Sequence, residues 1–397
     1  MIKKLLVIVL VILSAASVYS QQQTLFVDKK YDDALAMSRT LNKPLVIMFY
    51  ASWCPHCNVM KKDIFTDTTV AEFYNNNFVC MAVDAESAYG KELRAKFQQK
   101  FRINSFPTFA FFDVNESLLY CTAGEFKKEK FLSEGKDVLL PENQLPNIRA
   151  AFLSDVSNAD KCLKYIVTVR KAGFDATAIA QKFLSTVKPE DKITEINWKI
   201  FSNGINNFDT DEFRFLVQNK DAFAKVASPS RVDKKIVYTI TETLKPLLDK
   251  VDTINYAKKR LVAESFRIRK VDSLLYRFDL QIIPQTSNWK QYQKTTSENV
   301  EKFSLKDPVV LYDICNTYNE SVTDKKGLLQ AVEWSNHLLA LGESNDRYVV
   351  TTKLLMKLKE YKKALEFAQK GKNFAESLGL KAEEINTLLI EIKKYSN

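Results

Sequence analysis

The chain has 397 residues, a hydrophobic content of 46% and a formal net charge of +10. This length and content are typical of a globular protein with room for two cores. The positive charges are interrupted by acids, as in the segment 357–363, which favours solvated helix faces over a stripe that binds nucleic acid. We therefore expect no nucleic-acid partner.

Residues 1–20 have the layout of a secretory signal peptide. Lys3 and Lys4 precede an apolar run, and small residues precede a predicted cleavage site at Gln21. The run is shorter than the roughly 20 residues that a membrane-spanning helix needs, so an uncleaved anchor is the less favoured alternative. We expect a mature protein without a membrane span, exported to the periplasm or the extracellular space.

The segment 21–140 has the pattern of one α/β domain. The expected elements are a helix over 31–41, a strand over 45–50, a helix after the residues 54–57, a strand over 78–84, a helix over 91–101, strands over 106–113 and 117–122, and a closing helix over 126–140. Strands that alternate with helices in this way predict a mixed sheet flanked by helices.

Two cysteines, Cys54 and Cys57, follow the strand over 45–50 and can close and open a disulfide. They are expected where the strand turns into a helix, and a helix start favours the thiolate, the reactive form of cysteine. A metal site is the competing use of Cys54, His56 and Cys57. Such a site needs about four ligands, and the only other histidine, His337, lies far along the chain. We expect a redox pair with no metal and no cofactor.

The residues around this pair resemble the active site of the thioredoxin superfamily. Trp53 precedes the first cysteine, and Ser105-Phe106-Pro107-Thr108 resembles the family's cis-proline loop. The stretch 31–115 is most similar to thioredoxin-like domains that act outside the cytoplasm, whereas Pro55-His56 is the dipeptide of the oxidising DsbA-type enzymes. The resemblance implies a thioredoxin-like fold and thiol–disulfide exchange, with its direction left open.

The resemblance also implies roles for single residues. Cys54 would be the exposed nucleophile and Cys57 the buried thiol that resolves a mixed disulfide. His56 would donate to the Cys54 thiolate or stabilise its charge, unless it is a bystander at the surface. Pro107, if cis rather than trans, would present backbone to a substrate strand. Further substrate contacts are expected from Trp53, Phe106 and Thr108.

One position departs from the family pattern. Many thioredoxins carry a buried acid six residues before the first cysteine, where it takes the proton of the resolving thiol; here that residue is Met48. No carboxylate replaces it locally, so deprotonation of Cys57 should depend on water or on a distant acid.

Four further cysteines lack the spacing of a disulfide framework: Cys80, Cys121, Cys162 and Cys315. Cys80 and Cys121 fall in predicted strands, which would not be neighbours in the thioredoxin strand order. We expect buried free thiols here rather than structural bridges.

Residues 141–147 contain two prolines and predict a linker. Beyond it, apolar residues recur at helical intervals, which predicts an all-helical domain over 148–397. Its last part, 328–395, resembles degenerate tetratricopeptide repeats, whose hairpins stack because none buries its apolar face alone. Such an array could select or position a partner, support self-association, or serve as a passive spacer or tether.

Taken together, the sequence predicts an exported thiol–disulfide oxidoreductase that reduces, oxidises or isomerises disulfides. Its expected partners are cysteine-containing exported proteins and a redox recycling partner. The alternative is a helical scaffold protein whose thioredoxin-like domain docks partners without turnover. Intact Cys54, Cys57 and Pro107 favour the enzyme, because docking alone requires none of them.

Overall fold

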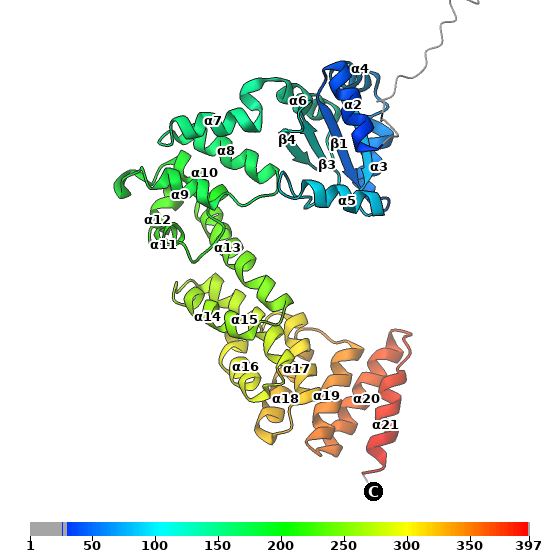
Figure 1. Cartoon of the computed structure of the whole chain (residues 1–397). Coiled ribbons are helices and arrows are strands. Elements are labelled where there is room, and N and C mark those ends of the chain that lie inside the picture. Colours follow the sequence, from blue (N-terminus) through cyan, green and yellow to red (C-terminus); the bar gives the residue numbers. More distant parts are fainter. Residues whose placement is uncertain (1–25, 27–29, 396–397) are drawn as a thin grey trace, which may run out of the picture. The chain divides into compact units, whose positions relative to one another are not determined.

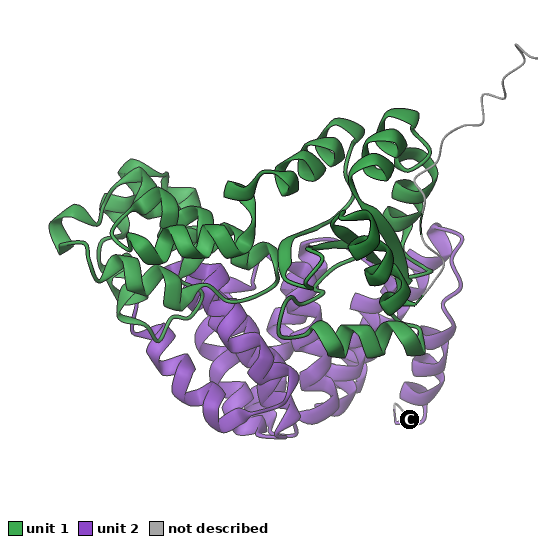
Figure 2. Cartoon of the chain, turned by 45° about the horizontal axis from the view of Figure 1, so that its top comes forward, with its two compact units in different colours: residues 1–235 green, residues 236–397 purple. Residues whose placement is uncertain are grey.

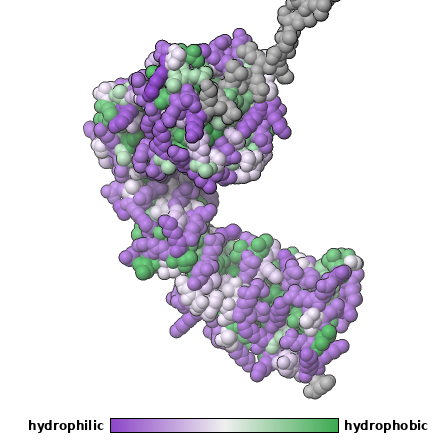
Figure 3. Space-filling model, turned by 45° about the vertical axis from the view of Figure 1, so that its right-hand side comes forward, coloured by the Kyte–Doolittle hydropathy of each residue, from purple (hydrophilic) through white to green (hydrophobic). Residues whose placement is uncertain are grey.

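The computed structural model describes residue 26 and residues 30–395 (Figure 1). The predicted signal peptide lies outside these residues. The chain divides into two compact units, residues 1–235 and 236–397 (Figure 2). Figure 3 shows hydrophilic side chains over most of the face in view, with small hydrophobic patches between them.

The first unit contains a mixed sheet of four strands. They are β1 (Leu45–Tyr50), β2 (Val79–Asp84), β3 (Thr108–Phe112) and β4 (Leu118–Ala123), in the order β2-β1-β3-β4. β1 pairs with β2 in parallel and with β3 antiparallel, and β3 pairs antiparallel with β4. The strands are almost continuously apolar because both faces of the sheet are covered. The expected mixed sheet is confirmed.

Helices cover both faces of this sheet (Figure 1). On one face, Leu45 and Ile47 share a core with α2 (Tyr31–Leu41) and α5 (Ala88–Phe97). On the other face, Val46 and Met48 share a core with four other helices that flank the sheet. These are α3 (Pro55–Val59), the π-helix η1 (Met60–Ile64), α4 (Thr68–Asn77) and α6 (Lys128–Leu139). Side chains alternate between the two faces along β1, so Val46 and Met48 point to the second face. Cys54 and Cys57 belong to the same core, so the cysteine pair lies on that face.

Some element bounds differ from the sequence expectation. The strand expected over 106–113 begins at Thr108, since Pro107 has no N–H to donate to a strand ladder. The helix expected over 91–101 begins at Ala88, because the Ser87 side chain accepts from the N–H of Gly90 and caps it.

Further helices complete the first unit. They are η2 (Pro141–Asn143), α7 (Leu145–Ser154), α8 (Ala159–Lys171), α9 (Thr177–Leu184), η3 (Pro189–Asp191), α10 (Glu195–Gly204), α11 (Asp211–Gln218) and α12 (Lys220–Val226). Both α7 and α8 pack against β4. The segment 141–147, predicted as a linker, therefore lies inside a compact unit, and Gln144 ties it to the carbonyl of Val138 at 3.0 Å. The break between units falls within α13 (Pro229–Asp249).

The described part of the second unit is helical throughout. After α13 come α14 (Thr253–Glu264), α15 (Arg269–Gln285), α16 (Trp289–Phe303), α17 (Pro308–Ser321), α18 (Lys325–Ala340), α19 (Asn345–Lys357), α20 (Tyr361–Ser377) and α21 (Glu383–Lys393). The helices from α17 to α21 each pack against the next. Gly371 permits α20 to pack closely against α19 and α21, since a Cβ at this position would lie 2.6 Å from both Tyr348 Cβ and Ile385 Cδ1. An all-helical region after the sheet domain is confirmed, whereas its likeness to tetratricopeptide repeats stays a prediction.

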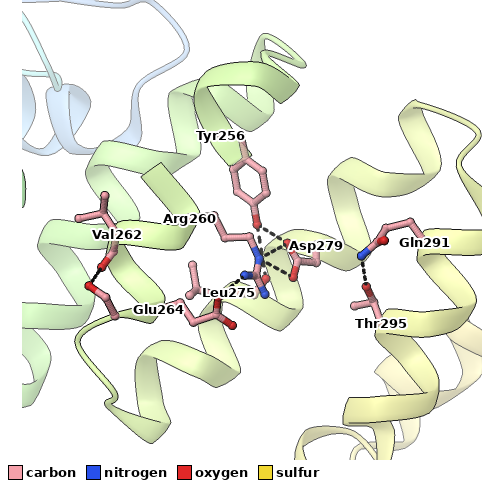
Figure 4. Close-up of polar contacts among 9 residues, drawn as sticks. Tyr256, Arg260, Val262, Glu264, Leu275, Asp279, Gln291 and Thr295 are labelled. Atoms are coloured by element: carbon pink, nitrogen blue, oxygen red, sulfur yellow. Dashed lines mark hydrogen bonds and ion pairs between the residues drawn. The ribbon is translucent and has the colours of Figure 1, made fainter. Parts of the chain in front are cut away.

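A buried ion pair joins α14 to α15 (Figure 4). The Nε atom of Arg260 donates to both carboxylate oxygens of Asp279 at 2.9 Å, and the Tyr256 hydroxyl donates to one of them at 2.7 Å. Burial raises the pKa of Asp279 and Arg260 opposes that shift. Removing Arg260 alone would leave a buried, unpaired carboxylate, which is strongly destabilising.

Within the described residues, no helix is both long enough and apolar enough to cross a membrane.

Candidate active site

Cys54 stands at the start of α3, directly after the turn that follows β1. Its backbone N–H donates to the carbonyl of Ala51 at 3.1 Å. The N–H of Cys57 donates to Cys54 Sγ at 3.3 Å, so this sulfur acts as the N-cap acceptor of the helix. Negative charge on Cys54 Sγ is therefore stabilised both by this hydrogen bond and by the helix N-terminus.

Cys57 lies one turn into the helix and is completely buried, in the core that also contains Met48 and Met60. Burial raises the pKa of the Cys57 thiol to about 12, and its hydrogen bond with Cys54 acts in the same direction. Cys57 is thus protonated at neutral pH. Cys54 is also largely covered, with 3% of its surface exposed, so the expectation of an openly exposed nucleophile is corrected.

The loop before β3 provides this cover. The Phe106–Pro107 peptide bond is cis, and the Cys54 thiol lies 3.7 Å from the carbonyl oxygen of Phe106, within hydrogen-bonding distance for sulfur. The Thr108 side chain is buried and donates to the carbonyl of Ser105 at 2.7 Å. Thr108 therefore fixes the shape of the loop from inside, while the half-buried Phe106 lies at its surface.

Trp53 flanks the pair on the open side. Its ring is 66% exposed and meets the ring of Phe106 edge-on, with 6.2 Å between the centroids. The indole Nε1 donates to a carboxylate oxygen of Glu86 at 2.8 Å. Trp53 and Phe106 together form an aromatic rim beside the cysteine pair.

His56 is exposed and pairs with an acid rather than with a sulfur. Its Nδ1 lies 2.7 Å from Oε2 of Glu125, a residue that follows β4 in the chain. The predicted contact of His56 with the Cys54 thiolate is thus replaced by a contact with Glu125. Any influence of His56 on Cys54 is electrostatic and shared with that carboxylate.

The sequence reasoning missed one group behind the pair, Lys61. Its Nζ lies 3.0 Å from the ring centroid of Tyr50, the last residue of β1. Tyr50 is paired across the sheet with Asp84 of β2. Burial lowers the pKa of Lys61, while charge on Cys57 or Asp84 would raise it. The available signal was spacing: Lys61 comes four residues, or one helical turn, after Cys57.

The other four cysteines are buried and apart from this site. Cys80 lies in β2 and Cys121 in β4, which are separated by two strands and face different cores. Cys162 and Cys315 lie in α8 and α17. Burial raises the pKa of each of these thiols to about 12, so all four behave as apolar side chains at neutral pH. Over the described residues, no group of three His, Cys, Asp or Glu side chains is placed to hold a metal ion.

Comparisons with known proteins concern the first part of the chain. Residues 31–139 match the thioredoxin-like domain family. The thiol:disulfide interchange protein DsbD of Pseudoalteromonas atlantica is 27% identical over 111 residues, which are 28% of this chain and 18% of that protein. The match therefore spans less than a fifth of the relative's length.

Two solved structures are also similar. A proposed disulphide-isomerase from Bacteroides thetaiotaomicron is 25% identical, covers 30% of this chain and 96% of its own, and has a TM-score of 0.27. A thioredoxin from Thermus thermophilus is 21% identical, covers 30% of this chain and 88% of its own, and has a TM-score of 0.26.

The matched residues run from α2 to the end of α6 and include the whole sheet. They also hold both cysteines of the pair and the loop that covers them. Residues 31–139 therefore form a thioredoxin-like domain.

Proposed function

We propose that this chain is an exported thiol–disulfide oxidoreductase that works through Cys54-Pro55-His56-Cys57. The observation that carries the proposal is the contrast between the two sulfurs. Cys54 Sγ accepts an N–H at a helix start, and Cys57 is buried one turn behind it with a raised pKa. The names of the relatives, a thiol:disulfide interchange protein and a disulphide-isomerase, support the same chemistry.

The reducing reaction has two steps. The Cys54 thiolate attacks a disulfide in the partner, a bond forms between Cys54 and one partner sulfur, and the other leaves as a thiolate that takes up a proton. Cys57 then loses its proton and attacks Cys54 Sγ. The Cys54–Cys57 disulfide forms, the second partner thiolate leaves, and two electrons have passed to the partner.

The oxidising reaction runs these steps in reverse, from a partner thiolate that attacks Cys54 Sγ of the closed pair. The potential of the pair relative to its surroundings sets the direction. In either direction Cys54 is the sulfur that meets the partner, because Cys57 is completely buried one turn behind it. In the reduced pair Cys57 also holds its proton at neutral pH.

Export rests on the predicted signal peptide, and the partners we propose are exported proteins with cysteines together with a recycling partner. Self-association through the helical region is a further proposal, and the molar mass of the mature protein in solution tests it.

The decisive experiment uses the mature full chain with insulin as a disulfide substrate and dithiothreitol as the reductant. The wild type should accelerate insulin reduction, and Cys54→Ser should abolish the acceleration. When the reduced protein is mixed with insulin without dithiothreitol, Cys57→Ser should accumulate a mixed disulfide detected by mass. A docking protein without turnover would give the same slow rate for the wild type and Cys54→Ser. That result would exclude the proposed function.

A further inference from the structure

Two clefts meet beside the cis-proline loop, both within the first unit. One has a volume of about 470 Å³ and lies between the thioredoxin-like domain and the C-terminal end of α8. The other has a volume of about 400 Å³ and runs along α5. Arg102 and Asn104 line both clefts, so the two adjoin each other at the residues that lead into Ser105, Phe106 and Pro107.

The end of α8 is held firmly against this loop. The N–H of Arg102 donates to the carbonyl of Ala172 at 2.8 Å. Gly173 follows with φ of +82°, and a Cβ there would lie 2.6 Å from the carbonyl oxygen of Arg102. Glycine is therefore required for this close approach. The helices after the thioredoxin-like domain thus supply one wall of a cleft that reaches the cis-proline loop at Ser105 and Thr108.

The lining of the two clefts is strongly basic. Its six cationic side chains are Lys91, Arg94, Arg102, Lys130, Arg170 and Lys171. Among the described residues that line the clefts, Glu134 is the only acid, and it is buried. Lys130 and Lys171 approach its carboxylate at 2.5 and 3.4 Å. Lys91 and Arg94 of α5 and Arg102 of the loop line the smaller cleft, and the described residues of that lining include no Asp or Glu that could neutralise them.

Acids do lie on the other side of the cysteine pair, but they are already engaged. Glu86 accepts from the indole of Trp53, and Glu125 pairs with His56. The indole of Trp53 is uncharged, so Glu86 keeps its negative charge, and the cations of the two clefts lie on the side of Arg102.

We propose that the two adjoining clefts bind an acidic segment of the polypeptide whose cysteine reacts with Cys54. The proposal rests on the proposed function, because the ligand must carry a sulfur to the pair. An extended chain advances roughly 3.3 Å per residue, so residues a few positions from the reacting cysteine reach the clefts. Clustered lysines and arginines would raise the rate of encounter with an acidic partner.

The test uses the reduced full chain and short peptides that each carry one cysteine as a mixed disulfide with nitrothiobenzoate. Attack by Cys54 joins the peptide to the protein and releases nitrothiobenzoate, which is measured by its absorbance. The peptides differ only in flanking residues, which are glutamates, glutamines or lysines. We expect the glutamate peptide to react about 10 times faster than the glutamine peptide at low ionic strength. At about 1 M salt this preference should largely disappear.

Variants that remove positive charge identify the side chains responsible for the preference for the glutamate peptide. Lys91→Gln/Arg94→Gln changes two exposed side chains of α5 away from α8, and should bring the rate ratio of glutamate to glutamine peptide close to one. Arg102→Gln tests the shared position of the two clefts separately. Lys182→Gln/Lys188→Gln removes the same charge from exposed sites outside the clefts and should keep the wild-type ratio.

The possible failures are distinguishable. If wild type and Cys54→Ser release nitrothiobenzoate equally slowly from every peptide, the proposed function fails. If Cys54 reacts but the peptides do not differ, or if the α5 and control variants lower the ratio equally, the acidic-partner inference is overturned. Tighter binding of a short single strand of DNA than of the glutamate peptide would overturn the choice of a polypeptide.

Discussion

Cys54 and Cys57 differ in the groups around their sulfurs, although both side chains are nearly covered. Cys54 Sγ accepts a backbone N–H at a helix start, whereas Cys57 is completely buried in the hydrophobic core on that face of the sheet. Burial raises the pKa of Cys57 to about 12, and this shift favours its thiol form throughout the neutral range. The two sulfurs should therefore differ in reactivity far more than in exposure.

In the reduced protein, iodoacetamide at mildly acidic pH should label Cys54 and leave Cys57 unmodified, because only a thiolate reacts at a useful rate. Mass analysis of the peptides that contain each cysteine gives the two rates. Cys54→Ser controls for direct labelling of Cys57, which should stay slow. Equal labelling of both thiols in the wild type would contradict the roles assigned here.

Lys61 should help Cys57 to lose its proton during resolution, since its charge lowers the pKa of Cys57 and Met48 offers no acid. Lys61→Gln should move the pH dependence of mixed-disulfide resolution upward by about one unit. Lys62→Gln is the matched control, because that neighbouring lysine is exposed. Rapid mixing at several pH values measures the resolution rate, and an identical profile in both variants would remove Lys61 from the mechanism.

His56 carries a prediction for the redox potential. If its charge stabilises the Cys54 thiolate, His56→Ala should make the pair more reducing by about 30 mV, a tenfold change in the equilibrium constant. Glu125→Gln should shift the potential the opposite way, because the carboxylate 2.7 Å from the ring opposes that positive charge at Cys54. Equilibration with glutathione gives both potentials. Unchanged values would show His56 to be a bystander.

The sequence contained the parts of this site that are local in the chain. The cysteine spacing, the following helix and Pro107 could all be recognised from short motifs. The contact of His56 with Glu125 joins residues 69 positions apart, and no motif connects them. The position of Lys61 over Tyr50 likewise depends on how helix and sheet pack, which periodicity does not specify.

At the scale of elements, the four strands were predicted well and one helix was missed. The segment of α4 is rich in asparagine and threonine, which have low helix propensity. It is helical because Asp67 caps its first turn and because Val70, Ala71 and Tyr74 are buried against the sheet. Burial against the sheet therefore outweighs the low helix propensity of this segment. The sequence pattern alone does not show that burial.

In α13, Lys235 is a buried cation whose Nζ donates to Asn206 at 3.0 Å. Burial lowers its pKa from 10.5 to about 7, Arg170 acts in the same direction, and Asp175 opposes both. Between these two values the unfolded chain binds a proton that the folded chain lacks, so stability rises with pH across this window. Below pH 7 the buried Lys235 is charged in the folded protein, so the full free-energy cost of burying this charge lowers the stability.

Lys235→Met should therefore stabilise the protein by about 2 kcal/mol near pH 6 and by much less near pH 10. Urea unfolding followed by circular dichroism at both pH values measures the difference. Lys234→Met, at the adjacent and more exposed position, should show no such pH dependence. A stabilisation that is equal at both pH values would mean that hydrophobic packing, and not the charge, determines the effect.

At the scale of the whole molecule, composition indicated two parts but not where compact packing ends. The change from β-branched runs to helical periodicity occurs near residue 141, and the last helix that covers the sheet within the thioredoxin-like domain, α6, ends at Leu139. Yet α7 and α8 pack on β4, and the loop at Arg102 is tied to Ala172, so the first unit continues to residue 235. Periodicity reports the type of each element and not which elements share a core.

This packing predicts different behaviour for two shortened proteins. One that ends at Leu140 loses the helices that cover β4 and one wall of the larger basic cleft, so it should be less stable and show a weaker preference for glutamate peptides. One that ends at Asp249 keeps the first unit and all of α13, so it should retain that preference. Both keep the cysteine pair, so both should react with a small uncharged disulfide wherever they stay folded.

A native partner separates the roles of the two units. Proteins trapped as mixed disulfides by Cys57→Ala in the full chain provide the substrates. If the protein that ends at Asp249 reduces them as fast as the full chain, and if molar mass in solution is also unchanged, the second unit has no role in selecting partners or in self-association. We expect slower reduction instead, because stacked helices of this length present an extended surface that binds other chains. A loss confined to trapped partners, with peptide rates unchanged, would assign partner selection to residues 250–397.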